Sequence, residues 1–484
     1  MPNNLVDKAF QRLRKELDIG GDFPRKVLDE VEESAVVRQP RAGPDRIDRL
    51  DIDFVTVDPP GSRDLDQAVH AERRDGGFLL HYAIADVGFW VDRGSLIEEE
   101  AWRRGVTFYS PDGRDPLYPP SLSTGVASLL PGQVCPAILF SFELNERTEL
   151  GSWTVERALV RSRQQLTYAQ LLEGARSYFA RNAGDREPWT ETLPLLEEIG
   201  NGRIALEVER GGVSLPIRSQ EVQQEAAAEL GYAVVYESSS AAEKWNEQIS
   251  LLTGHAAATR MLEAGVGVLR TMPPMAEESG EKLRGIARTL GFDWDSKTPY
   301  ADFIHGLDPE HPRIQVLVRQ ARRVIRGADY VFFQGDPPEQ PLHAALAFPY
   351  AHVTAPLRRL GDRYVLDLLV SLSEGSGPTP AEVAKLEGVP AVMNAADTKS
   401  GRLERRVIDI AEAAALSARV GEVFDAVVVD ARGNELEFQV DTPPVRATVK
   451  RTAKHRAWPA LGERVQIRVV KANVIEGRST FEIA

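Results

Sequence analysis

Hydrophobic and polar positions follow two periods along the chain, one typical of helices and one typical of strands, and their distribution divides it into three parts. The first part, residues 1–45, carries four hydrophobic residues at helical spacing: Val6, Phe10, Leu13 and Leu17. Gly20 and Gly21 then end this helix, and Pro24 suits the first turn of a second one. Two short helices around a tight turn fit either a helix-turn-helix that reads DNA or a plain helical hairpin packed on the protein body.

The second part, residues 46–419, begins with strands and continues with helices. Runs rich in hydrophobic and β-branched residues predict strands at 54–58, 78–87 and 136–144. Thr167 and Gln170 have the spacing of a capping box and predict a helix running toward Arg181. Further helices are predicted at 243–264, 312–326, 358–373 and 401–419. Strands followed by helices favour an α+β domain over a repeating βαβ sheet.

The third part, residues 420–484, consists of short alternating runs. It contains five strand candidates in succession: EVFDAVVVD, ELEFQV, VRATVK, RVQIRVV and STFEI. In the second of them Leu436, Phe438 and Val440 alternate with polar residues, as the buried face of a strand requires. Five such strands predict a five-stranded OB-fold barrel, which is a frequent binder of nucleic acid.

Composition indicates a globular protein of several domains. The 484 residues are 43% hydrophobic and 27% charged, which excludes a disordered or fibrous chain. The single cysteine, Cys135, excludes an intramolecular disulfide framework and a cysteine-based zinc site. No hydrophobic run is long enough to span a bilayer, so we predict a cytoplasmic protein without a membrane partner. The formal net charge of −14 argues by itself against a nucleic-acid partner.

The distribution of charge along the chain reverses that last expectation. Between Arg446 and Lys471 there are eight basic residues and one acid, so this part of the predicted barrel carries a charge of +7. We predict that the barrel contacts RNA or DNA through basic residues that begin in its third strand: Arg446, Lys450, Arg451 and Lys454. Between Arg313 and Arg326 there are five arginines and no acid, a pattern that fits a nucleic-acid channel and a solvated helix face equally well.

The segment from Phe54 to Ala68 carries the densest candidate chemistry. A hydrophobic run delivers Asp58 to its end, Pro59–Gly61 forces a turn, and this turn can return Asp64 and Asp66 toward Asp58. Three carboxylates held together repel one another unless a cation neutralises them, and their oxygens suit Mg²⁺ or Mn²⁺. The spacing alone also fits a surface turn in which each carboxylate caps a backbone amide, and that arrangement is the commoner one.

This segment resembles the signature of the ribonuclease II (RNB-domain) exoribonucleases, in which a strand-borne aspartate precedes a tight Asp-x-Asp-Asp group. The resemblance continues through blocks that keep their order along the chain: HYAIADV at 81–87, RGVTFY at 104–109, PLYPPSLS at 116–123, LTY at 166–168, Asn246–Glu247, and YAHVTAPLRR at 350–359. Several ordered blocks are far more specific than any single motif. The predicted barrel is placed as the S1 domain of that family is.

The resemblance implies catalytic roles for Asp58, Asp64, Asp66 and Arg358. Asp58 is implied to ligate Mg²⁺, or Mn²⁺ in its place, while Asp64 and Asp66 complete the site and help to place or activate the attacking water. Gln67 stands where the family has its fourth aspartate, so its amide oxygen can touch the metal but adds no charge. Arg358 matches the arginine beside the scissile phosphate, where a guanidinium offsets charge in the transition state.

The resemblance also implies three contacts to RNA within the second part of the chain. Tyr109 lies where the family stacks a side chain on the 3′-terminal base. Tyr168 and Glu247 match residues that hold the terminal sugar, and a carboxylate there can accept the hydrogen bond of the 2′-OH. His352 lies in the YAHVTAP block, and we expect it to be a packed histidine.

We therefore predict a magnesium-dependent 3′→5′ exoribonuclease that degrades single-stranded RNA to nucleoside 5′-monophosphates. The predicted domains are a helical region at 1–45, an RNB catalytic domain at 46–419 and an S1-like barrel at 420–484. We expect a monomer with little affinity for duplex DNA. Two alternatives remain: an RNA-binding protein that kept the fold but lost catalysis with Gln67, and a DNA-binding regulator that uses the first two helices.

Overall fold

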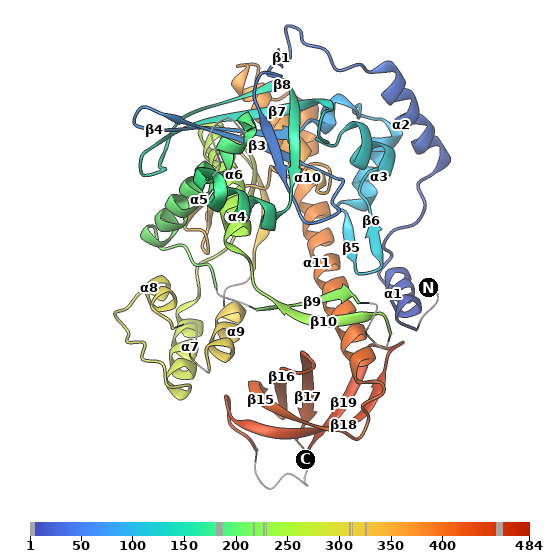
Figure 1. Ribbon diagram of the computed structural model, residues 1–484, viewed down its shortest axis with the longest axis vertical. Helices are drawn as coiled ribbons and strands as arrows, with labels where there is room; N and C mark the ends of the chain where they lie inside the picture. The colour runs from blue at the N-terminus through green and yellow to red at the C-terminus, as the bar shows by residue number, and fades with distance from the viewer. Residues whose placement is uncertain are drawn as a thin grey trace.

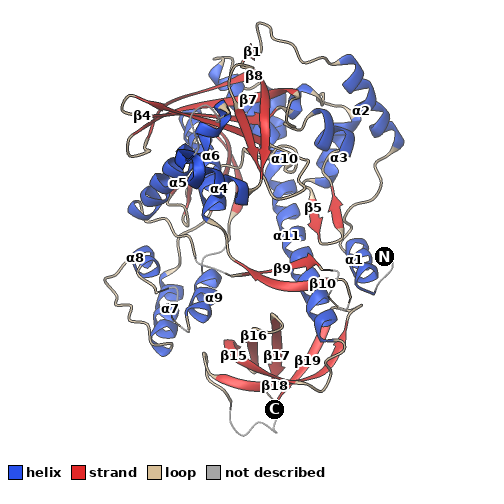
Figure 2. Ribbon diagram, in the orientation of Figure 1, coloured by secondary structure: helices blue, strands red, loops and turns tan. Residues whose placement is uncertain are grey.

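The computed structural model describes residues 5–180, 187–215, 218–225, 228, 230–308, 311, 313–324, 327–451 and 458–484. A central sheet with helices around it forms the larger part of the molecule, and a small strand-rich part lies near the far end of the longest helix (Figure 1). Figure 2 shows strands concentrated in these two regions, with helices covering the first of them. The predicted α+β fold class is confirmed.

Six strands form the central sheet in the order β1-β8-β2-β3-β4-β7. Their bounds are Ile47–Asp48 (β1), Phe54–Val57 (β2), Gln67–Arg74 (β3), Gly77–Ala85 (β4), Val134–Asn145 (β7) and Leu150–Leu166 (β8). The long strand β8 pairs antiparallel with β7 over most of its length, and its last residues pair in parallel with β2. The pairing therefore runs from β2 through β3, β4, β7 and β8 back to β2. All four residues of β2 are buried, which explains why hydrophobic and β-branched residues follow one another in it without polar alternation on one face.

Helices surround this sheet and connect it to the small strand-rich part (Figure 1). Their bounds are Leu96–Arg104 (α3), Tyr168–Ser177 (α4), Thr192–Glu209 (α5), Ala241–Ala264 (α6), Glu277–Thr289 (α7), Tyr300–His305 (α8), Ile314–Val324 (α9), Leu360–Ser373 (α10) and Pro380–Leu416 (α11). The predicted capping box of Thr167 and Gln170 is present, and the same device begins α6 and α11. None of the helices in the described ranges is long and apolar enough to cross a membrane.

The predicted helices agree with the structure except at one start. Those at 243–264, 312–326 and 358–373 correspond to α6, α9 and α10. The helix predicted at 401–419 is only the last part of α11, which begins at Pro380. Thr379 caps that beginning and Glu382 completes its capping box, a start signal that the prediction missed.

Short pairs of strands and single helical turns fill the space between these elements. The strands are Phe108–Ser110 (β5), Gly113–Asp115 (β6), Ser219–Gln224 (β9), Tyr232–Glu237 (β10), Val266–Thr271 (β11), Asp329–Gln334 (β12), Leu342–His343 (β13) and Phe348–Pro349 (β14). The turns are Val87–Phe89 (η1), Leu122–Val126 (η2), Tyr178–Ala180 (η3) and Pro188–Glu191 (η5). β5 and β6 form a hairpin that packs against α11.

The two N-terminal helices exist, but they do not form the predicted unit. They are α1, Leu5–Glu16, and α2, Arg25–Val37. α1 packs against α11 and buries Val6, Phe10 and Leu13, whereas α2 packs against α3. Figure 1 shows the two helices in different parts of the molecule. The helix-turn-helix and the simple hairpin are therefore both wrong, because each helix buries its hydrophobic face against a separate partner.

The C-terminal part is the predicted barrel. Its strands are Val423–Arg432 (β15), Glu435–Val440 (β16), Val445–Lys450 (β17), Arg464–Asn473 (β18) and Arg478–Ile483 (β19). They pair antiparallel in the order β17-β16-β15-β18-β19, and β17 also lies against β19, so the barrel is nearly closed. Leu436, Phe438 and Val440 are buried in its core, as their alternation predicts.

The packing of α6 against the segment before Arg358 generates a stability prediction. Gly254 on α6 is buried, and a Cβ atom there would lie 2.2 Å from Tyr350 Cε2 and 2.5 Å from the Ala351 carbonyl oxygen. We expect Gly254→Ala to destabilise the protein by about 1–3 kcal/mol through overpacking. In the control Gly285→Ala, on α7, the new methyl group meets nothing within 4 Å. That control should gain up to about 1 kcal/mol of helix propensity. Denaturant unfolding measures both, and equal effects would contradict the prediction.

Candidate active site

Asp58 directly follows β2, at the edge of the sheet where the parallel strand β8 also ends. Its backbone N–H donates to the carbonyl oxygen of Leu166, the last residue of β8, at 3.0 Å. Tyr168, which opens α4 two residues later, therefore lies close enough for the negative charge of Asp58 to help raise the pKa of its hydroxyl, after burial. The carboxylate oxygen Oδ2 of Asp58 is buried and has no hydrogen-bond partner among the described residues.

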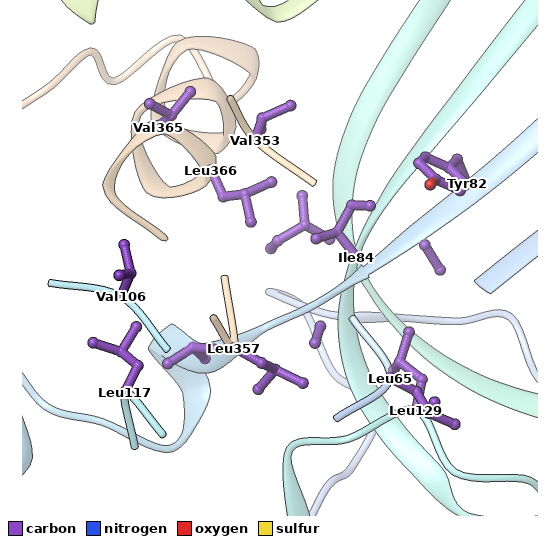
Figure 3. Packing of buried hydrophobic residues seen from close by; sticks show 14 of the residues in the cluster. Leu65, Tyr82, Ile84, Val106, Leu117, Leu129, Val353, Leu357, Val365 and Leu366 are labelled. Atoms are coloured by element: carbon purple, nitrogen blue, oxygen red, sulfur yellow. The ribbon is translucent and has the colours of Figure 1, made fainter. Parts of the chain in front are cut away.

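Leu65 anchors the loop that returns from Asp58 to β3. Its side chain is fully buried, its N–H donates to Ser128 Oγ at 2.9 Å, and its carbonyl accepts from the N–H of Leu129 at 3.0 Å. Figure 3 shows Leu65 and Leu129 together in the hydrophobic core. Because Leu65 is fixed between Asp64 and Asp66, the two carboxylates contact different partners.

Asp64 is held by the β5–β6 hairpin. Tyr109 on β5 donates its hydroxyl hydrogen to Asp64 Oδ2 at 2.9 Å, and Arg114 on β6 donates to Asp64 Oδ1 at 2.5 Å. Tyr109 and Arg114 are directly opposite one another in the hairpin, so their side chains leave it on one face. The hairpin therefore fixes both oxygens of Asp64.

Asp66 is held by the segment before α10. The backbone N–H of Leu357 donates to its Oδ1 at 2.7 Å, and Arg358 Nε donates to its Oδ2 at 3.2 Å. Leu357 is itself part of the hydrophobic core, which fixes the direction of these donors (Figure 3). Arg358 keeps 43% of its side chain exposed, so its guanidinium also faces solvent.

Burial makes the ionised forms of Asp58 and Asp66 costly. It raises the pKa of each carboxyl to about 7, although the positive charge of Arg358 opposes the shift in both. Asp64 adds to the shift through its negative charge. A bound cation would remove this cost, and the buried, unpartnered Oδ2 of Asp58 is a suitable ligand atom for it.

The carboxylates do not form a preassembled metal cage. Within the described ranges, no three His, Cys, Asp or Glu side chains are grouped closely enough to hold a metal ion. Protein donors bind both oxygens of Asp64 and of Asp66, which leaves Asp58 as the carboxylate with a free oxygen. The side-chain nitrogen of Gln67 donates to the carbonyl of Thr354, so this residue is tied to the segment before Arg358. Its role as a metal ligand remains a prediction.

The residues implied to hold RNA surround Asp58 and Asp64. Tyr109 is 52% exposed although its hydroxyl binds Asp64, so one face of its ring is available to a base. Asn246 on α6 bonds the hydroxyl of Tyr168, and its neighbour Glu247 is exposed. The protein packed around the Glu247 carboxyl, and after it the negative charge of Glu207, raise the pKa of that carboxyl although part of the side chain is exposed to solvent. Tyr168 and Glu247, which are far apart in sequence, thus lie on adjacent helices.

Several neighbours of Arg358 have structural roles. Arg359 binds the fully buried Asp362 through Nε at 3.0 Å and Nη2 at 2.7 Å, so Asp362 pairs with Arg359 and leaves Arg358 for Asp66. Arg363 is buried and donates to the Val91 carbonyl, so it too has a structural role. His352 packs between Tyr330 and Tyr350, as expected, and burial lowers its pKa well below the usual value.

A basic groove lies between the barrel and helices α9 and α11. It consists of two recesses, of about 560 and 530 Å³, that share Arg319, Arg405, Arg432 and Arg446. Other arginines line one recess or the other: Arg218, Arg322, Arg323, Arg402 and Arg406. Glu437 and Asp430 of the barrel pair with Arg319 and Arg323, so part of this positive charge is neutralised. Arg319, Arg322 and Arg323 of α9 thus face a groove, whereas Arg313 does not line it and Arg326 lies outside the described residues. That these arginines form a nucleic-acid channel stays a prediction.

The basic residues predicted on the barrel do not all lie in this groove. Arg446 on β17 lines both recesses. Lys450, at the end of the same strand, is exposed and pairs with Glu435 at 3.1 Å, and Arg451 lies over the ring of Trp458. Lys454 lies outside the described residues. The predicted patch is therefore divided between the groove and the end of β17.

Arg114 is a site residue that the sequence reasoning missed. It pairs across the hairpin with Tyr109, which was identified, and it binds Asp64. The signal available in the sequence was the turn at Pro111–Gly113, which places residue 114 opposite residue 109 once a hairpin is assumed.

Comparison with known proteins agrees with this geometry. The sequence model described as the RNB domain matches residues 46–375, and the one described as the RNase II-type exonuclease C-terminal S1 domain matches residues 422–484. Ribonuclease R of Escherichia coli is 24% identical over 95% of this chain and 60% of its own length. This chain therefore spans less than two thirds of that relative.

Solved structures share the fold. Mycoplasma genitalium RNase R, in complex with ribose-methylated single-stranded RNA, superimposes with a TM-score of 0.86 at 19% identity, over 98% of this chain and 77% of that one. Yeast Ssd1, described as a pseudonuclease, superimposes with a TM-score of 0.69 at 15% identity, over 91% of this chain and 55% of that one. At these identities the likeness establishes the fold alone.

The Arg359–Asp362 pair predicts a stability effect next to the site. Asp362 also accepts a hydrogen bond from the backbone N–H of Ala355 at 2.8 Å, so it holds the loop that carries Arg358. Asp362→Asn leaves Arg359, whose side chain is only 19% exposed, without its counter-charge, and we expect a loss of about 3–5 kcal/mol in the free energy of unfolding. Urea unfolding followed by tryptophan fluorescence measures it. The exposed pair Glu278–Lys282 provides the control, because Glu278→Gln should leave the unfolding midpoint unchanged.

Proposed function

We propose that this chain, which belongs to the RNB-domain family, is an exoribonuclease that shortens single-stranded RNA from its 3′ end and releases nucleoside 5′-monophosphates. The observation that carries the proposal is the set of Asp58, Asp64, Asp66 and Arg358, gathered at the carboxyl end of β2 within the segment that matches the RNB domain. An arginine beside carboxylates that are costly to ionise is an arrangement suited to phosphodiester hydrolysis.

Asp58, Asp64 and Asp66 are the proposed ligands of Mg²⁺, or of Mn²⁺ in its place. The bound ion supplies a Lewis acid that neutralises the phosphodiester and favours deprotonation of the attacking water. The fit rests on the free Oδ2 of Asp58 and on the burial that raises the pKa of Asp58 and Asp66. Gln67 offers its amide oxygen without adding charge, so we expect weaker metal affinity than four carboxylates provide.

Arg358 binds the scissile phosphate and offsets the charge that grows in the transition state. Its Nε is occupied by Asp66 while the rest of the guanidinium faces solvent, which supports this assignment. Asp66 orients the guanidinium, and Leu357 orients Asp66. The backbone of Leu357 thus orients Asp66, and Asp66 in turn orients Arg358, so the three residues act as one unit.

The RNA strand enters along the basic groove, and its 3′ end lies at Tyr109. The groove arginines attract the phosphate backbone, and those that the barrel contributes to both recesses are Arg432 and Arg446. Tyr109 stacks on the terminal base, a contact worth about 1–3 kcal/mol. Tyr168 and Glu247 bind the terminal ribose, with Glu247 accepting the 2′-OH hydrogen bond and thus selecting RNA over DNA. Lys450 and Arg451 extend the contact along the barrel surface, and contact of Lys454 with RNA stays a prediction from the sequence.

The domain boundaries, the monomeric state, the low affinity for duplex DNA and the cytoplasmic location stay predictions. The DNA-binding regulator loses its structural basis, because α1 and α2 do not form a helix-turn-helix. The non-catalytic RNA-binding protein is the remaining alternative, and it gives the opposite result in the following assay.

Incubation of 5′-labelled single-stranded RNA with the protein and Mg²⁺ tests the activity. We expect a ladder that shortens from the 3′ end. Asp66→Asn should reduce cleavage at least about 100-fold, since it weakens both the metal site and the grip on Arg358, while RNA binding by gel shift changes little. Asp75→Asn, in an exposed turn, is the matched control. Intact RNA retained by the wild-type protein would support the non-catalytic alternative.

Metal binding has a test that does not depend on activity. Mg²⁺ at 100 times its dissociation constant should stabilise the folded protein by about 2.7 kcal/mol, seen as a rise in Tm. Asp58→Asn should abolish that rise, because it removes the charge of the carboxylate with the free oxygen. Asp75→Asn should retain it. An equal rise in Tm for Asp58→Asn and wild type would exclude Asp58 as a ligand.

A further inference from the structure

Arg14 on α1 binds the outer side of the β5–β6 hairpin. Its two terminal nitrogens donate to the two carboxylate oxygens of Asp112, each at 2.6 Å, and Nη1 also donates to Ser110 Oγ at 2.8 Å. Asp115 adds a weaker ion pair at 3.8 Å. Only 19% of the Arg14 side chain and 13% of the Asp112 side chain are exposed. This is a bidentate, largely buried pair, unlike an ordinary surface ion pair.

The same hairpin binds Asp64 on its inner side. Ser110 follows Tyr109 directly, Asp112 lies in the turn, and Arg114 is the cross-strand partner of Tyr109. Tyr109 and Arg114 hold both oxygens of Asp64. We call the contact of Arg14 with Ser110 and Asp112 the clamp. On a hairpin of only eight residues, each residue of the clamp lies at most two positions from a residue that binds Asp64.

α1 is a fixed base for this clamp. Val6, Phe10 and Leu13 are buried where α1 packs on α11, and Phe10 meets the ring of Tyr232 edge-on at 5.4 Å. The hydroxyl of Tyr232 donates to Asp7 at 2.7 Å. Arg14 thus reaches the hairpin from a helix that is anchored both to α11 and to β10.

We propose that Arg14 is a positioning residue, which holds the hairpin where Tyr109 and Arg114 fix Asp64 for hydrolysis. This inference rests on the proposed nuclease function. α1 lies outside both segments that match known domains, 46–375 and 422–484, so those matches assign it no role. Arg14 itself touches neither Asp64 nor the proposed path of the RNA. Its effect on hydrolysis therefore passes through the hairpin.

Hydrogen exchange tests the clamp without any substrate. Arg14→Gln removes the charged, bidentate contact with Asp112. Arg12→Gln, two residues away on the same helix, removes only an exposed pair with Glu16 and is the matched control. We expect amides of residues 108–115 to exchange at least about tenfold faster in Arg14→Gln and at the wild-type rate in Arg12→Gln. Equal exchange in the two variants would overturn the clamp.

Kinetics test whether the clamp acts through Asp64. A displacement of about 1 Å at a catalytic group can cost as much as 100-fold in rate, so we expect Arg14→Gln to lower kcat about tenfold. KM should rise by a smaller factor than kcat falls, because the groove arginines keep their positions and only the stacking of Tyr109 on the terminal base is disturbed. Tyr109→Phe combined with Arg114→Gln keeps the ring of Tyr109 but removes both contacts of the hairpin with Asp64. In that background Arg14→Gln should have a much smaller effect on kcat, which is the non-additivity expected of residues that act through the same contacts.

The outcomes separate this inference from the proposed function. Additive losses when Arg14→Gln is combined with Tyr109→Phe and Arg114→Gln, or a kcat of Arg14→Gln within twofold of wild type, would overturn the positioning role. A loss expressed in KM alone would do the same. If the wild-type protein degrades no RNA, the proposed function fails and the role in hydrolysis fails with it. The exchange experiment still decides in that case whether Arg14 holds the hairpin.

Discussion

The burial of negative charge at the end of β2 is the constraint on which the rest of the site depends. Asp58 and Asp66 are withdrawn from water, and the pKa of each is raised to about 7 as a result. The protein offsets this with a backbone N–H and a guanidinium from one short segment, residues 357 and 358. Asp362 holds that segment in place, because it accepts a hydrogen bond from the backbone N–H of Ala355. Buried carboxylates whose ionisation is this unfavourable are typical of sites that bind a ligand or catalyse a reaction.

The helix α11 connects the elements around this site to the rest of the molecule. At 1.5 Å per residue its 37 residues span about 55 Å. Along that length it packs against α10, the β5–β6 hairpin, α1, and strands β18 and β19 of the barrel (Figure 1). One continuous helix therefore sets the distance between the carboxylates and the barrel. The basic groove lies along it, so the positions of the groove and of Tyr109 are coupled through a single element.

Elements with a local cause were predictable from the sequence. The barrel strands follow from alternation in stretches such as Leu436–Val440, and α4 follows from the capping box of Thr167 and Gln170. The two errors had different origins. The start of α11 was a local signal, a capping box, that was overlooked. The N-terminal pair failed because the cause was not local: both hydrophobic faces are covered by helices that are distant in sequence. A hydrophobic stripe indicates that one face of a helix is buried, but it does not indicate which element covers that face.

The sequence by itself determined the candidate carboxylates, the strand that presents Asp58 and the likeness to the RNB exoribonucleases, because these depend on spacing along a few residues. Only the tertiary structure decided the pairings: Asp66 with Arg358, Asp362 with Arg359, and Asp64 with the hairpin that Arg14 holds. Asp66 and Arg358 are 292 positions apart, and Arg14 and Asp112 are 98 apart. An ion pair has no period in the sequence, so its partners are chosen only when packing brings two distant segments together.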